Sequence, residues 1–133
     1  MNSIRTFSAA AVAIALVSLA NCKAEPAGPA AGTLVVSLAG PNTDDGAALF
    51  TLTGPGIRDA QSANSAYRVY WRLVSATELR LLVVGNLSSG IVATVSVDDL
   101  SKRSQYAGSV LEVASRDDVV RQSISGYRIT VSR

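Results

Sequence analysis

The sequence predicts an all-β domain with the architecture of an antiparallel β-sandwich, and two observations support this prediction. Short runs rich in Val, Ile, Leu, Thr and Tyr recur from residue 33 to the C-terminus, and segments rich in Gly, Asn, Asp and Ser separate them. No segment in this region keeps the 3.6-residue apolar period of an amphipathic helix. Because helices that could connect parallel strands are not expected, the sheets should be mainly antiparallel.

The first strands follow from apolar runs that end in turn residues. Residues 33–38 read "TLVVSL" and precede "AGPNTDDG", whereas residues 47–53 read "AALFTLT" and precede "GPG". Gly, Pro, Asn and Asp favour turns because each supplies a backbone conformation or a local hydrogen bond that turns require. Beyond a turn of helix at residues 60–66 or around residues 100–106, we expect no helix in this region.

Residues 67–74 show the clearest alternation. One face of this predicted strand carries Tyr67, Val69, Trp71 and Leu73, and the other face carries Arg68, Tyr70 and Arg72. A half-buried strand has this period of two residues. We therefore expect Trp71 in the core and the Arg and Tyr side chains on the outside.

The remaining predicted strands complete the sandwich. They cover residues 79–84, 91–97, 109–115, 119–124 and 127–132, and polar loops connect them. The total is about eight strands, with a spacing that suits a sandwich or a barrel.

The N-terminus is typical of an export signal. One positive residue, Arg5, precedes an apolar run from Phe7 to Ala20, and small residues follow. A membrane-spanning helix is the alternative, but it needs about 18 to 20 apolar residues, and this run is shorter.

The single cysteine follows this apolar run. The segment Leu19-Ala20-Asn21-Cys22 resembles the lipobox of bacterial lipoproteins, in which the cysteine is acylated. Asn21 departs from the small residue that the family prefers. The resemblance implies lipidation of Cys22, for example by palmitate, and the alternative is cleavage after Ala24 to give a secreted or periplasmic chain.

These features divide the chain into three parts. Residues 1–21 are a lipoprotein signal peptide, expected to be helical, and residues 22–32 are a flexible tether of Ala, Pro and Gly. Residues 33–133 are the β-sandwich domain. Lys23, after the cysteine, resembles the residue found in lipoproteins of the Gram-negative outer membrane. We therefore expect a lipid-anchored protein of the bacterial cell envelope, at the outer membrane.

Three segments resemble the cohesin-like β-sandwich of bacterial extracellular proteins, a fold of immunoglobulin-like architecture. They are "ALFTLTGPGI" (48–57), "LRLLVVGNLSSGIVATVSV" (79–97) and "SISGYRITV" (123–131). The resemblance implies the fold and a role in binding or adhesion. The opening of the domain also looks like small uncharacterised bacterial lipoproteins, which adds no activity.

Composition argues against several classes of function. The chain has no histidine, so it lacks the usual general base and the commonest metal ligand. One of its 12 Lys and Arg residues, Arg5, lies in the signal, which leaves 11 against 10 Asp and Glu. Nucleic acids attract a clear excess of positive charge, so we expect no nucleic-acid partner. We also expect no cofactor and no enzymatic activity.

Three aspartate pairs lie in predicted connections. They are Asp44-Asp45, Asp98-Asp99 and Asp117-Asp118. We interpret them as turn residues, because an aspartate side chain accepts hydrogen bonds from nearby backbone N–H groups. The alternative is a calcium loop formed by Asn42, Asp44 and Asp45, since Ca²⁺ is held by oxygen ligands.

A basic and aromatic strip is the candidate ligand surface. Its residues are Arg68, Tyr70, Arg72 and Arg80, on predicted outward faces of adjacent strands. Arg and Tyr are common in recognition surfaces, although arginine stems also cover ordinary sheet faces. The sequence thus favours a non-enzymatic binding or structural module that contacts an envelope protein, and the alternative is an extracellular carbohydrate-binding module. An unknown glycan is then the second candidate partner.

Overall fold

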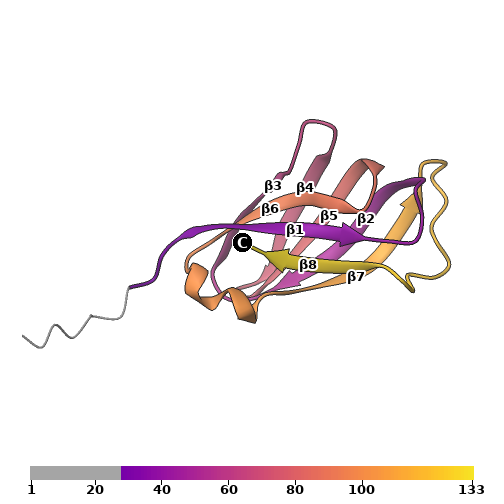
Figure 1. Cartoon of the computed structure of the whole chain (residues 1–133). Helices are drawn as coiled ribbons and strands as arrows, with labels where there is room; N and C mark the ends of the chain where they lie inside the picture. The colour runs from indigo at the N-terminus through magenta and orange to yellow at the C-terminus, as the bar shows by residue number, and fades with distance from the viewer. Residues whose placement is uncertain (1–27) are drawn as a thin grey trace, which may run out of the picture.

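The computed structural model describes residues 28–133, which form two stacked antiparallel sheets of four strands each (Figure 1). This confirms the predicted all-β class and is consistent with a sandwich. The first sheet has the order β3-β6-β1-β8 and contains β1 (Gly32–Ala39), β3 (Ile57–Ser62), β6 (Gly90–Val97) and β8 (Arg128–Ser132). The second has the order β4-β5-β2-β7 and contains β2 (Asp45–Thr53), β4 (Arg68–Ser75), β5 (Glu78–Leu87) and β7 (Ala107–Ser115).

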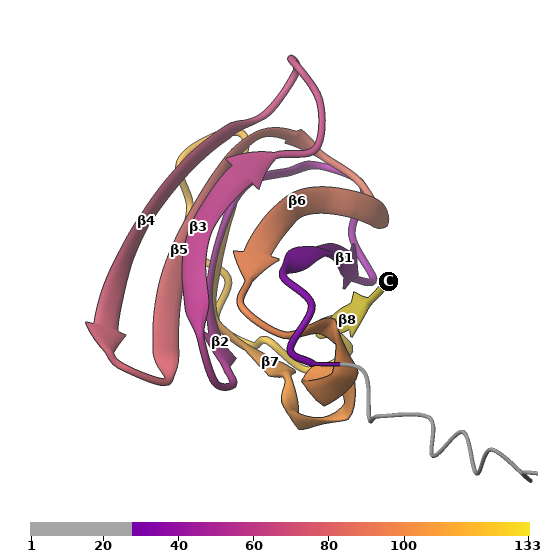
Figure 2. The same ribbon diagram turned by 90° about the vertical axis from the view of Figure 1, so that its left-hand side faces the viewer.

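The core between the sheets is formed by alternate side chains, most regularly those of β1, β2 and β5. Leu34, Val36 and Leu38 of β1 face Phe50 and Leu52 of β2, and all five are buried. Figure 2 shows the two curved layers end on, with β1 and β6 inside the arc formed by the other sheet. The alternation seen in the sequence is therefore the alternation between core and surface.

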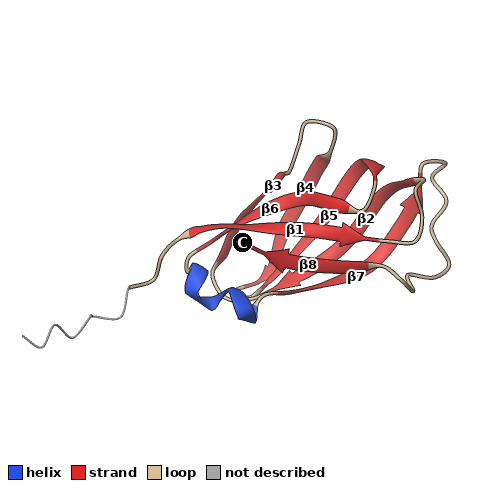
Figure 3. Ribbon diagram, in the orientation of Figure 1, coloured by secondary structure: helices blue, strands red, loops and turns tan. Residues whose placement is uncertain are grey.

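One 3₁₀-helix, η1 (Leu100–Gln105), connects β6 to β7 (Figure 3). The sequence predicted a turn of helix here, and the prediction is confirmed. Asp99 is its N-cap, since its side chain accepts a hydrogen bond from the Ser101 N–H. Within residues 28–133, no helix is long and apolar enough to cross a membrane.

The N-terminal edge of the domain includes the last residues of the predicted tether. The Leu100 N–H donates to the carbonyl of Ala30 at 2.7 Å, and β1 already begins at Gly32. The predicted signal helix, Cys22 and the tether up to residue 27 lie outside the described residues.

Strand β3 replaces the turn of helix expected at residues 60–66. It occupies Ile57–Ser62 and pairs with β6. Only Ile57 and Ala60 are buried, because the strand lies at the edge of its sheet and its remaining side chains are polar. An apolar pattern this sparse gave no strand signal.

The strand predicted at residues 119–124 is wrong. One isolated bridge, between Ala114 and Val120, is the only strand-like pairing of this segment. Asp118, with a φ of 61°, lies in the tight turn that brings the chain back beside the end of β7. There the Ser115 N–H donates to the Val119 carbonyl and the Arg121 N–H donates to the Val113 carbonyl, and the pairing ends after these two hydrogen bonds. Val119 and Val120 are exposed in the resulting loop, so their apolar character does not reflect a buried strand face.

The expectation that Trp71 lies in the core is also wrong. Its side chain faces the same side of the sheet as buried Leu81, its cross-strand neighbour on β5, yet it is 39% exposed. Leu73, one step along the same face, is 48% exposed. Strand β4 is the outermost strand in Figure 2 and projects beyond β3, so the opposite sheet does not cover it.

A turn at one end of the sandwich depends on a buried aromatic ring. Tyr106 packs against the turn of residues 54–56, and its hydroxyl donates to the carbonyl of Pro55. Gly54 has a φ of +153°, and its N–H donates to the carbonyl of Thr77 at 2.9 Å. A Cβ at Gly54 would lie 2.2 Å from Cδ1 of Tyr106, so only glycine fits here.

Gly54→Ala should destabilise the domain more than Gly90→Ala. Both glycines have a similar positive φ, +153° and +145°, so the backbone strain of the two substitutions is similar. Only the Gly54 side chain would meet another residue, since nothing lies within 4 Å of a Cβ at Gly90. We expect an additional loss of about 1–3 kcal/mol for Gly54→Ala from overpacking. Urea denaturation of both variants measures this difference, and equal midpoints would contradict the packing described here.

Candidate binding surface

The predicted strip forms on the outer face of β4 and β5. Tyr70 lies directly opposite Leu82, and Arg72 lies directly opposite Arg80. Cross-strand partners of this kind share a face. Arg68 lies on the same face, opposite Val84 near the other end of the strand pair.

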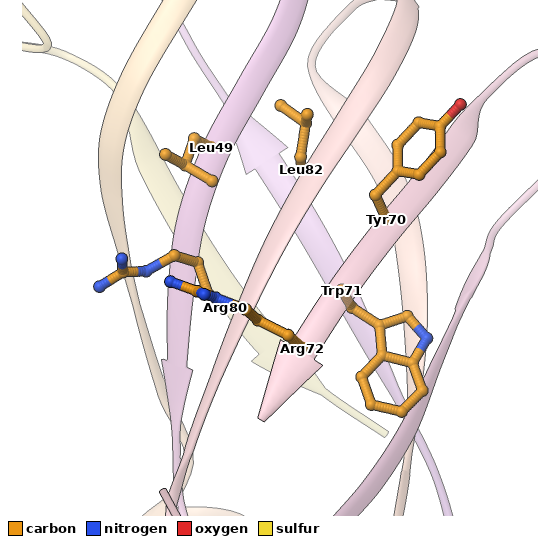
Figure 4. Close-up of a pocket in the computed structure, with 6 residues that line it drawn as sticks. All are labelled: Leu49, Tyr70, Trp71, Arg72, Arg80 and Leu82. Atoms are coloured by element: carbon orange, nitrogen blue, oxygen red, sulfur yellow. The ribbon is translucent and has the colours of Figure 1, made fainter. Parts of the chain in front are cut away.

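A shallow hollow of about 220 Å³ lies among these side chains (Figure 4). Leu49 of β2 and Leu82 of β5, which are cross-strand neighbours, contribute its apolar part. Tyr70, Arg72 and Arg80 supply its polar and aromatic groups, and Trp71 also lines it. Figure 4 shows the Tyr70 ring and the Trp71 indole leaving β4 in different directions. The hollow is therefore an aromatic and cationic surface over an aliphatic base.

The positive charge of this surface is poorly compensated. Arg72 and Arg80 are directly opposite each other, an arrangement of like charges that destabilises a strand pair. The nearest carboxylate is that of Glu78, whose Oε1 lies 3.8 Å from Nη2 of Arg80. The Nε of Arg80 is buried and has no hydrogen-bond partner among residues 28–133. An anionic group bound over this surface would reduce the repulsion between the two guanidinium groups.

The sequence did not predict the aliphatic half of the surface. Leu49 and Leu82 became part of it because β2 lies beside β5 in the sheet. The outer face continues into a second hollow of about 290 Å³ over β2, β5 and β7, where Ala47 lies opposite Val84 and Ala114. Small side chains on three adjacent strands make this second depression.

The proposed calcium loop holds an arginine and a tyrosine in this structure. Asp45 is 2% exposed, and its Oδ1 accepts from Nε and Nη2 of Arg121 at 3.0 and 2.8 Å. Its Oδ2 accepts from the Tyr127 hydroxyl at 2.7 Å. The hydroxyl oxygen of Tyr127 in turn accepts from Nδ2 of Asn42, also at 2.7 Å. Asp44 binds Arg121 as well, and this hydrogen bond is the main cause that lowers the pKa of Asp44.

This network ties the segment between β7 and β8 to the start of β2. In residues 28–133, no group of three or more His, Cys, Asp or Glu side chains gathers as a metal site would require. Both oxygen atoms of Asp45 already accept hydrogen bonds, from Arg121 and from Tyr127, which gives this loop a structural role.

Of the second aspartate pair, Asp99 acts as predicted for a turn residue, since its side chain accepts from the Ser101 backbone N–H, whereas Asp98 forms an ion pair. Asp98 accepts from Nε and Nη2 of Arg58 at 2.7 and 2.8 Å, and this hydrogen-bonded pairing holds the pKa of Asp98 below its ordinary value. Asp99 caps η1, and the hydrogen bond from the Ser101 side chain lowers the pKa of Asp99 in the same way. The third pair lies in the turn after β7, where Asp118 has its positive φ.

Comparisons of this chain with protein-family models, with curated proteins and with solved structures found no match. Its function is therefore argued from its own residues.

Asp45→Asn should be much more destabilising than Asp44→Asn. The two carboxylates are adjacent and share Arg121, but the Asp45 side chain is 3% exposed and that of Asp44 is 59% exposed. Loss of a buried charge-assisted hydrogen bond should lower the free energy of unfolding by about 2 kcal/mol for Asp45→Asn. Surface pairs contribute little because water screens them. Chemical denaturation measures both variants, and a larger effect at Asp44 would contradict this assignment.

The domain should lose stability in acid, with Asp98 contributing to the loss. Its folded-state pKa is below the ordinary 3.8, so the contribution is fully present above that value and disappears as the pH falls through the folded pKa. Urea midpoints measured between about pH 5 and pH 2 should therefore fall, and they should fall less for Asp98→Asn. Asp117→Asn is the matched control, because Asp117 makes no ion pair within residues 28–133. A pH dependence unchanged by Asp98→Asn would contradict the stabilising role of Arg58.

Proposed function

We propose that this chain is a cell-envelope lipoprotein whose β-sandwich is a non-enzymatic module that binds another envelope protein. The observation that carries the proposal is the outer face of β4 and β5, where exposed Tyr70 stands beside Arg72 and Arg80 over an aliphatic base. Tyr and Arg contribute strongly to protein recognition because each offers a large apolar surface together with directional hydrogen bonds.

The charge of this face indicates the chemistry of the partner. Arg72 and Arg80 repel each other, and Arg68 adds a third positive charge on the same face. A carboxylate can accept two parallel hydrogen bonds from one guanidinium group. An acidic protein surface would therefore pair with this face and remove its internal repulsion.

The anchor rests on the sequence around Cys22. Acylation there would attach the chain to the outer membrane, and the Ala, Pro and Gly tether would separate the domain from the lipid. Intact mass of the mature protein tests this step. A lipid-sized increment that Cys22→Ser abolishes supports anchoring, whereas an unmodified chain beginning at Glu25 supports the secreted or periplasmic alternative.

The resemblance to the cohesin-like fold supports a binding role of the same kind. A carbohydrate-binding module is the second candidate, and it would present aromatic rings side by side. Tyr70 is 57% exposed, but Trp71 follows it directly and projects to the opposite face of β4. Tyr106 is buried, so a platform of coplanar rings has few possible members.

A photoreactive phenylalanine derivative at position 70 should cross-link a different envelope protein when the chain is expressed in cells. The same probe at Val119, which is 63% exposed in the loop after β7, is the matched control. Arg72→Ala combined with Arg80→Ala should reduce the cross-linked product at least about tenfold, since charge-assisted hydrogen bonds of about 1.5–3 kcal/mol are lost. Arg103→Ala, on η1, should leave it unchanged.

Three results would contradict the proposal. Equal cross-linking from positions 70 and 119 would show that the outer face of β4 is not a preferred contact. A product insensitive to the double arginine variant would show that its charge is not used. A cross-linked product that glycosidases reduce to nearly the mass of the chain alone would favour the carbohydrate-binding alternative.

A further inference from the structure

Within residues 28–133, no strand pairs with the outer side of β4, which is a long sheet edge. It spans Arg68–Ser75, and its neighbour in the sheet is β5. At the edge of the other sheet, β3 carries a polar side chain at most positions, and Arg58 on it is paired with Asp98. The opposite edge strand of that sheet, β8, has five residues. The fourth edge strand, β7, has nine residues, and the chain that follows it pairs back beside its end through Ala114 and Val120. Short or charged edges resist pairing with other chains. Strand β4 has two charged residues, Arg68 and Arg72, but five of its eight residues are apolar or aromatic.

Apolar side chains of β4 are exposed on both of its faces. Trp71 and Leu73 project beyond the cover of β3 with 39% and 48% exposure, and Tyr70 on the other face is 57% exposed. A strand in this position gains both apolar burial and backbone hydrogen bonds when another strand is added beside it.

We propose that β4 pairs antiparallel with β4 of a second copy of this chain, about a two-fold axis at Trp71. The two copies would then form one continuous sheet of eight strands. In this register Trp71 lies opposite its own counterpart, Val69 lies opposite Leu73, and Tyr70 lies opposite Arg72. Interfaces between identical subunits are self-complementary about such an axis.

The charges of β4 select this register over its neighbours. A two-fold axis perpendicular to the sheet must fall on a residue, because opposed side chains share a face. An axis at Tyr70 would place Arg72 opposite Arg68, and an axis at Arg72 would oppose that arginine to itself. Like charges directly opposite are destabilising. The axis at Trp71 instead places each guanidinium of Arg72 against a tyrosine ring, a favourable cation–π contact.

The backbone accommodates the same register. Alternate residues of β4 direct their N–H and C=O groups away from β5. If the odd-numbered residues do so, the backbone of Trp71 forms hydrogen bonds with Trp71 of the second copy, and the backbone of Val69 with Leu73. If the even-numbered residues do so, the backbone of Tyr70 forms hydrogen bonds with Arg72 of the second copy. In both cases the central residues of the strand supply paired hydrogen bonds.

A second copy also fits the overall charge. The formal net charge of the whole chain is +2, so two copies repel each other only weakly. The pairing would bring two hollows together, and each would receive Tyr70 from the other copy beside its own Arg72. The inference goes beyond the proposed binding of another protein and does not depend on it.

Disulfide trapping in the full chain tests both the pairing and its register. Cys22→Ser provides a background without the native cysteine. Opposed residues of antiparallel strands have Cα atoms about 4.5–5.5 Å apart, a distance that a disulfide can bridge. Trp71→Cys should therefore form a covalent dimer on mild oxidation. Leu111→Cys, an exposed apolar position of β7 on the other edge of the sheet, is the matched control and should form little.

A pair of variants tests the register without altering Trp71. Val69→Cys and Leu73→Cys should each dimerise poorly alone and should cross-link to each other when the two proteins are mixed before oxidation. Sedimentation of the Cys22→Ser chain should give the mass of two copies, and Leu73→Lys should shift the equilibrium towards one copy.

The inference is overturned if the folded Trp71→Cys chain cross-links no faster than Leu111→Cys, or if the mixed variants cross-link no better than each alone. It is also overturned if β4 cross-links to a different protein and not to itself. Loss of the dimer with retained, arginine-dependent capture of an envelope protein would leave the proposed function intact. If the dimer is retained but the chain no longer captures an envelope protein, the proposed function is refuted and the proposed dimer stands.

Discussion

The lateral offset between the two sheets is the constraint on which the functional argument depends. On β5, the inward side chains Leu79, Leu81 and Val83 are fully buried. One strand further, on the same face of the same sheet, Trp71 is 39% exposed and Leu73 is 48% exposed. The covering sheet ends at β3, so burial decreases sharply from β5 to β4, where Val69 alone packs partly against the core (Figure 2). Strand β4 consequently has one paired edge, one open edge and two accessible faces.

This position gives β4 a rigid support and a free surface at once. Its neighbour β5 is anchored by a buried inner face, and β2 beyond it contributes fully buried Phe50. Recognition residues held on strands keep their geometry better than residues on loops. The outer face of β4 and β5 can therefore present Tyr70, Arg72 and Arg80 in a fixed arrangement, with the cost of their like charges offset by the core beneath.

Local alternation in the sequence was sufficient to predict most strands and the shared face of Arg72 and Arg80. It failed where burial depends on partners distant in the chain. The period of two residues assigned Trp71 correctly to the inward side of its sheet, but it carries no information about whether another sheet covers that side. Strand β3 was missed because an edge strand needs few apolar residues, and Ile57 and Ala60 alone give no clear period.

Contacts over long sequence distances explain the other differences. Asp45 and Arg121 are 76 positions apart, and nothing local in either segment predicts their ion pair. That ion pair and the hydrogen bond from Tyr127 fasten the chain after β7, where an apolar pair of valines resembled a strand. Asp44 and Asp45, which suggested calcium ligands because they lie in a predicted loop, thus bind a cation that the protein itself supplies, Arg121.

The exposure of the single tryptophan tests the central claim most directly. Trp71 is the only tryptophan of the chain, so its fluorescence reports this one position of β4. Acrylamide quenching should be measured at a dilution where sedimentation gives the mass of one copy, with the urea-unfolded chain as reference. The offset between the sheets predicts that the folded protein is quenched readily, at a substantial fraction of the unfolded value. Strong protection of Trp71 in the single folded copy would place it in the core and contradict the account.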